Sequence, residues 1–183
     1  MREQETIINT QQSERVNGRL LVPQLIHPFD TKRLHEVHVF LMQESMSHGG
    51  NIRDKTLEDI EQFARGGGQI WMMVNGSEII AVQTFEPMCG ARIPWWYINN
   101  GHTEMGWRGQ GIASGLISHA LALNGPGVGY FLIYVRQSLF ERLGFQEVAT
   151  EHLASVDEHI AQVVREKLRP GKEAHVFIRI PQK

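Results

Sequence analysis

The sequence predicts one α+β domain built around a mixed β-sheet. Segments with strand character alternate with segments whose apolar residues recur at helical spacing, which indicates a sheet covered by helices. Asn75-Gly76 lies between two apolar runs and is a strong signal for an antiparallel hairpin. Residues 130–135 form a continuous apolar run, which is the pattern of a strand buried on both faces.

The N-terminal end of the chain differs from the rest in composition. Residues 1–19 are polar and aperiodic, so we expect a flexible tail or a loose first element there. Residues 20–26 are mostly apolar and end before His27-Pro28, which predicts the first strand of a domain over 20–183.

Two amphipathic helices are predicted next. Asp30 or Thr31 can cap the first and Thr56 the second, because a short side-chain oxygen can accept from the unpaired N–H groups of a helix start. Glycines 66–68 end the second helix. The residues in phase are Leu34, Val37, Leu41 and Met42 in the first helix, and Leu57, Ile60, Phe63 and Ala64 in the second.

The middle of the chain reads as three strands. Residues 70–74 and 79–85 flank the turn signal Asn75-Gly76. Residues 95–103 form another strand, for which Asn99-Asn100-Gly101 predicts a bulge.

The second half alternates helices and strands. The predicted elements are a helix after the glycine-rich residues 108–113, a strand over 130–135, a helix over 139–143, a strand over 146–150, a helix over 156–168 and a strand over 173–180. The helix over 156–168 is an additional helix before the last strand. Its apolar stripe needs cover, either from the sheet or from a second subunit in a homodimer.

Composition excludes several classes of protein. The chain has 183 residues, 42% of them hydrophobic, which suits one globular domain. Its net charge of -2 gives no bulk attraction for nucleic acid or membranes. Cys89 is the only cysteine, so the sequence offers no disulfide framework and no thiolate zinc site. The polar N-terminal segment lacks the apolar core of a signal peptide, so we expect a cytoplasmic protein.

The most informative segment is Trp107-Arg108-Gly109-Gln110-Gly111-Ile112-Ala113-Ser114, which lies between a strand and a helix. Its glycines allow a ligand to approach the backbone closely. The unpaired N–H groups and the dipole at the start of the helix favour an anion such as a pyrophosphate. Arg108 adds a positive charge with a forked donor. The alternative is a tight strand-to-helix turn that binds nothing.

The sequence gives little evidence for other nucleotide-binding motifs, a serine hydrolase site or a metal site. The segment is neither a P-loop nor Gly-x-Gly-x-x-Gly, and Gly-x-Ser-x-Gly is absent. His35 and His38 share a helical face, but no third ligand has convincing spacing, so we expect no metal site.

Two motifs together resemble the GNAT acetyltransferase superfamily. Arg108-x-x-Gly111-x-Ala113 matches its pattern Arg/Gln-x-x-Gly-x-Gly/Ala. The run Leu139-Phe140-Glu141-Arg142-Leu143-Gly144-Phe145 is similar to its second signature, and one helix and one strand separate the two, as in that family. The order of elements agrees from about residue 20 to the end of the chain.

The resemblance implies that acetyl-CoA, or another acyl-CoA, is the co-substrate. The strand before the loop would run beside the pantetheine arm, the loop would hold the pyrophosphate, and Phe140 would border the site. The residues implied are Thr103, Glu104, Met105, Arg108, Gly109, Gln110, Gly111, Ile112, Ala113, Ser114 and Phe140. The strands over 95–103 and 130–135 would splay apart to admit the thioester.

The chain departs from the family at its acid and base. Phe140 stands where the family often has a tyrosine that protonates the leaving thiolate. Tyr97 and Asn99 stand where many members have a glutamate or histidine base. Tyr134 is a candidate replacement for the acid, and His102 or Glu104 for the base if the bulge turns them inward.

Two functions follow from the resemblance. The first is an N-acyltransferase that moves an acetyl or other short acyl group to the amine of a small molecule or protein. The second is an acyl-CoA-binding or sensor module with little or no catalysis, which the missing acid and base favour.

Overall fold

The computed structural model describes residues 14–16, 19–48, 55–91, 93–133, 137–168 and 175–181. Its strands form one eight-stranded sheet with the order β1-β2-β3-β4-β5-β6-β8-β7. All described pairings are antiparallel except that of β5 with β6. The strands are β1 Glu14–Val16, β2 Arg19–Leu25, β3 Gln69–Asn75, β4 Glu78–Met88, β5 Trp95–Thr103, β6 Gly129–Ile133, β7 Gln146–Glu147 and β8 Val176–Arg179. The predicted α+β class with a mixed sheet is confirmed.

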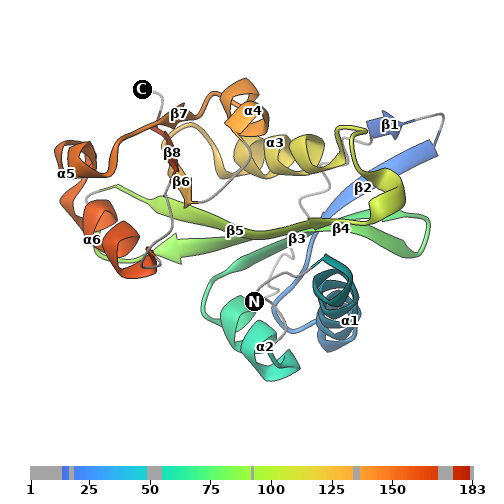
Figure 1. Ribbon diagram of the computed structural model, residues 1–183. Helices are drawn as coiled ribbons and strands as arrows, with labels where there is room; N and C mark the ends of the chain where they lie inside the picture. Colours follow the sequence, from blue (N-terminus) through green and yellow to red (C-terminus); the bar gives the residue numbers. More distant parts are fainter. Residues whose placement is uncertain are drawn as a thin grey trace, which may run out of the picture.

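Helices cover both faces of this sheet (Figure 1). One face carries α3 and α4, and the other carries α1 and α2 at one end and α5 and α6 at the other. The helices are α1 Thr31–His48, α2 Leu57–Arg65, α3 Ile112–Asn124, α4 Gln137–Arg142, α5 Leu153–Val156 and α6 Glu158–Lys167, with 3₁₀ turns η1 Met105–Trp107 and η2 Thr150–His152. None of the helices within the described residues has the length and apolar character needed to cross a membrane.

Alternation along β4 and β5 sorts their side chains between the two faces. Phe85 and Ile98 are cross-strand partners and belong to the core beneath α3. Val82 belongs to the core beneath α1 and α2, and Thr84 and Glu86 follow it at two-residue spacing. Glu86 therefore lies on the face between α2 and α6.

Several predicted boundaries move in the structure. The hairpin turn is Gly76-Ser77 rather than Asn75-Gly76, because Asn75 pairs with Glu78 and completes β3. Glu14–Val16 pairs with β2 as strand β1, inside the segment predicted to be a tail. The other residues of 1–18 lie outside the described residues.

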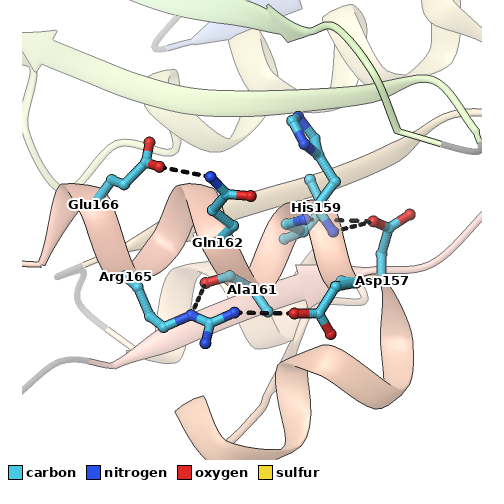
Figure 2. A network of polar contacts seen from close by, with 8 residues as sticks. Asp157, His159, Ala161, Gln162, Arg165 and Glu166 are labelled. Carbon is cyan, nitrogen blue, oxygen red and sulfur yellow. Dashed lines mark hydrogen bonds and ion pairs between the residues drawn. The ribbon is translucent and has the colours of Figure 1, made fainter.

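The predicted helix over 156–168 corresponds to α6, and a separate short helix, α5, comes before it. Asp157 has extended backbone angles and its carboxylate accepts from the backbone N–H groups of His159 and Ile160 at 2.9 and 3.3 Å, so it ends α5 and caps α6 (Figure 2). The predicted stripe is covered by the sheet: Ile160 and Val164 are 1% and 0% exposed. They pack against β6 and β8 in one core cluster.

Candidate functional site

The two parallel strands β5 and β6 pair over only three residues. Their described pairing ends at Tyr97 with Phe131, although β5 continues to Thr103 and β6 to Ile133. Beyond that point β5 pairs with β4, while β6 pairs with β8. The sheet therefore opens between β5 and β6, as the resemblance predicts.

The glycine-rich loop follows the open end of β5. Gly109 and Gly111 have φ angles of 77° and 82°. Residues other than glycine adopt this backbone region only at an energetic cost. Gly111 is the N-cap of α3 and offers no side chain to the first helical N–H groups, which have no partner within the helix. A hollow of about 440 Å³ lies beside this loop, lined by Gln110, Gly111, Ser114, Gly115, Ser118, Arg142 and Leu143.

Arg108 connects this loop to α1. Its Nη2 donates to Glu44 Oε2 at 2.9 Å, and its Nε donates to the Thr103 carbonyl at 2.8 Å. The Glu44 side chain is 12% exposed and that of Arg108 41%. Arg108 thus holds the end of β5 against α1. The sequence predicted a different role, in which its charge and forked donor bind an anion.

The other predicted donor-site residues fall into different environments. Met105 is exposed in η1, and Gln110 donates to the Gly106 carbonyl at 2.9 Å. Phe140 is 6% exposed and meets Phe145 edge to face, with 5.4 Å between the ring centroids. Glu104 Oε2 is buried without a hydrogen-bond partner among the described residues.

A second hollow, of about 460 Å³, continues along α3 and shares Ser118, Arg142 and Leu143 with the first. Arg179 lines it as well, so two guanidinium groups border this groove. Tyr130 also lines it, and burial raises the pKa of the Tyr130 phenol above its ordinary value. The two hollows form one groove along α3 and α4 that is suited to an elongated anionic ligand.

The predicted bulge in β5 is confirmed. The register with β4 shifts between Val82 and Thr84, and Asn100 has a φ of 46°. The Gln83 side chain fills the space beside Gly101 and donates to the Thr84 and Asn99 carbonyls. The extra residue places His102 opposite Val82 and therefore on the same face as Asn99, although the two residues are three apart.

The face opposite α3 holds a smaller cavity of about 110 Å³ between α1, α2 and the middle of β4 and β5. Its polar side consists of Thr84, Glu86, Asn99 and Asn100, and Lys55 and Asp59 border it as well. Thr84 Oγ1 contacts Asn99 Oδ1 and donates to the Asn99 carbonyl at 2.9 Å. Asn99 Nδ2 donates to Glu86 Oε2 at 3.3 Å, so these three side chains form one connected polar wall.

Lys167, the last residue of α6, joins this wall from the other side. Its Nζ lies 3.3 Å from Glu86 Oε2 and 4.6 Å from the centroid of the Tyr97 ring. Tyr97 in turn stacks on Phe131, with 5.0 Å between the ring centroids. A carboxylate and an aromatic face together make a binding place for an ammonium group.

The structure places only some of the predicted catalytic residues near the polar wall. Tyr97 and His102 lie on the face of β5 that carries the polar wall, while Glu104 follows the end of the strand. Tyr134 lies outside the described residues, so its role as acid stays a prediction from the sequence.

Sequence reasoning missed three residues of the site: Glu44, Glu86 and Lys167. A signal existed for Glu86, because it continues the spacing of Val82 and Thr84 along one strand. Glu44 and Lys167 reach the site through helix packing, 64 and 81 positions away from their partners. In the described part of the chain, no three His, Cys, Asp or Glu side chains are grouped to hold a metal ion.

No protein-family model and no curated protein matches the sequence. Solved structures of acetyltransferases nevertheless share the fold. A GNAT-family acetyltransferase of Staphylococcus aureus Mu50 is 16% identical, with a TM-score of 0.58 over 87% of this chain and 99% of that one. Arabidopsis thaliana NAA60, solved in complex with acetyl-CoA, is 17% identical, with a TM-score of 0.55 over 87% of this chain and 97% of that one.

A third similar structure was solved with two small molecules bound. N-acetylglutamate synthase of Neisseria gonorrhoeae, complexed with coenzyme A and N-acetyl-glutamate, is 14% identical. Its TM-score is 0.63 over 88% of this chain and 35% of that one. The chain therefore has the fold of the GNAT acetyltransferases.

Proposed function

We propose that this protein transfers an acetyl or other short acyl group from acyl-CoA to an amine. The main evidence for this proposal is the opening between β5 and β6. The glycine-rich start of α3 lies at one end of the opening, and the polar wall of Thr84, Asn99 and Glu86 lies at the other. The GNAT fold of structures solved with coenzyme A or acetyl-CoA supports the same conclusion.

The donor would enter from the face that carries α3 and α4. The N–H groups of Gly111, Ile112, Ala113 and Ser114 are available to a pyrophosphate at the positive end of the helix dipole. Thr103 and Ile98 are five residue steps of about 3.3 Å apart, so an extended pantetheine arm would travel about 16 Å along β5. Its thioester would then stand near Ile98 and Asn99, where the opening closes.

The acceptor would approach from the opposite face, through the space bordered by α2 and α6. Glu86 is the carboxylate of the polar wall on that face, and its Oε2 accepts from Asn99 Nδ2. An amine bound as ammonium must lose a proton before it attacks, and Glu86 can receive that proton directly or through water. Placing donor and amine on opposite sides of one opening supplies the proximity that this reaction needs.

One observation favours a second function, an acyl-CoA-binding module without efficient transfer. Phe140 is packed against Phe145 in the core and has no proton to give to the leaving thiolate. A leaving thiol tolerates unassisted departure, so the enzyme remains our first proposal.

A free-thiol assay separates the two functions. Acetyl-CoA with a panel of primary amines should release free thiol in proportion to acylated amine, as measured by absorbance and mass spectrometry. Both functions predict that acetyl-CoA raises the melting temperature, since a ligand of the native state stabilises it. Stabilisation without thiol release for any amine would favour the binding module, and the absence of both would refute the acyl-CoA site.

A further inference from the structure

The Lys167 amine lies beside Glu86, the carboxylate that we propose receives the proton of an acceptor amine. The Lys167 ammonium lies 3.3 Å from Glu86 Oε2, the same oxygen that receives Asn99 Nδ2. It also lies 4.6 Å from the centroid of the Tyr97 ring, and Tyr97 is the last residue of β5 that pairs with β6. The Lys167 amine is therefore held at the closed end of the opening, on the face opposite the donor loop.

The helix that carries Lys167 is well anchored. Asp157 caps the N-terminal end of α6, and Arg165 links Glu158 to the Ala161 carbonyl along it (Figure 2). The buried Ile160 and Val164 fix the helix on the sheet. The position of Lys167 is thus set by the packing of α6. A pair as exposed as Lys167 and Glu86, at 32% and 35%, contributes little to stability.

We propose that Lys167 is a self-acylation site, modified by acyl-CoA bound to the same chain. This inference rests on the proposed function. After the ammonium loses one proton to Glu86 or water, the nitrogen lone pair attacks the thioester carbonyl carbon. The C–N bond forms and the C–S bond breaks with its electron pair on sulfur. A second proton from the nitrogen ends on the thiolate, and the products are an amide and free CoA.

The test uses a matched lysine on the same chain. Lys32 has 86% of its side chain exposed, compared with 32% for Lys167, so a reaction governed by exposure alone would favour Lys32. The full chain would be incubated with acetyl-CoA without any other amine, and the acetylation of each lysine followed by peptide mass spectrometry. Acetic anhydride, which needs no binding site, provides the exposure-driven reference.

We expect acetyl-CoA to modify Lys167 at least roughly 10-fold faster than Lys32, and acetic anhydride to reverse that order. The rate at Lys167 should not change when the protein is diluted about tenfold, because the reaction is intramolecular. Gly111→Asp should abolish the modification. Gly76→Asp should preserve it, because Gly76 also has a positive φ but lies in the β3–β4 turn and lines none of the hollows described above.

Two failures can be told apart. If acetyl-CoA neither stabilises the protein nor releases thiol with any amine, the proposed function itself is wrong. If external amines are acylated while Lys167 stays unmodified, or while Lys32 or Lys55 is modified faster, self-acylation is overturned and the proposed function stands. Lys167→Arg, which keeps the positive charge, should remove the modified peptide and leave acetyl-CoA binding unchanged.

Discussion

Glu44 on α1 and Arg108 at the start of the glycine-rich loop form an ion pair of 2.9 Å across 64 positions of sequence. The same guanidinium holds the carbonyl of Thr103, the last residue of β5. One side chain thereby fixes the end of the open strand and the beginning of the loop to a helix on the opposite face of the sheet. We expect the shape of the loop to depend on Glu44, although Glu44 lines neither hollow beside α3.

Glu44→Gln should therefore weaken both stability and donor binding. Hydrogen bonds to charged groups contribute about 1.5–3 kcal/mol, and solvent screening of the partly exposed Arg108 lowers this contribution to about 1–2 kcal/mol. A double-mutant cycle with Arg108→Gln, followed by thermal melting, measures the coupling. Additive effects of the two substitutions would show that the pair does not hold the loop.

Glu86→Gln should lower turnover with external amines by about 10- to 100-fold, because the amide cannot take the proton of the amine. Acetyl-CoA affinity should be nearly unchanged, since Glu86 lies on the face opposite the loop. Thiol-release kinetics together with calorimetric titration separate these effects. A matched control is Glu58→Gln on the exposed side of α2, which should leave both quantities unaltered. Wild-type turnover in Glu86→Gln would remove this carboxylate from the mechanism.

Gly101→Ala should destabilise the bulge. A Cβ there would overlap the Gln83 amide, whose hydrogen bonds to the Thr84 and Asn99 carbonyls would be lost. Overpacking of this kind typically costs about 1–3 kcal/mol. Chemical denaturation measures the loss. The double variant with Gln83→Ala should recover part of it, and a Gly101→Ala protein as stable as wild type would contradict the structure of the bulge.

The start of α2 should respond to acid. The backbone N–H and the hydroxyl of Thr56 donate to Asp59 Oδ2 at 2.7 and 2.9 Å, and these bonds lower the pKa of the Asp59 carboxyl below its ordinary value. A carboxyl with a lowered folded-state pKa contributes stability above its unfolded pKa and loses it as pH falls through the folded one. Asp59→Ala should thus melt below wild type at neutral pH, and the difference should shrink in acid. A difference that stays constant with pH would refute this account.

Local signals predicted most of the fold. The limits of β5 were predicted to the residue, because Trp95 to Thr103 is bounded by Pro94 before it and by the turn after it. The Asn100-Gly101 pair identified the bulge through its tolerance of positive φ. The short helix α5 was missed, and the start of α6 was predicted two residues early although Asp157 is itself a good N-cap.

The candidate site was predicted less completely than the fold. The loop residues form a contiguous motif, so the sequence identified them together. Lys167 and Glu86 meet only because α6 docks beside β4, and no local pattern encodes a contact over 81 positions. The motif identified Arg108. Its contact with Glu44 could not be predicted, because it depends on how α1 crosses the sheet.

If the loop at the start of α3 binds acyl-CoA, Gly111→Asp should bind acetyl-CoA far more weakly than wild type in a calorimetric titration. The new carboxylate would meet the pyrophosphate, and juxtaposed like charges cost several kcal/mol, so the Kd should rise by about 100-fold or more. Gly76→Asp adds the same charge and similar backbone strain, with φ angles of 65° and 82° at the two positions, and should bind like wild type. Wild-type affinity in a folded Gly111→Asp protein would contradict the account.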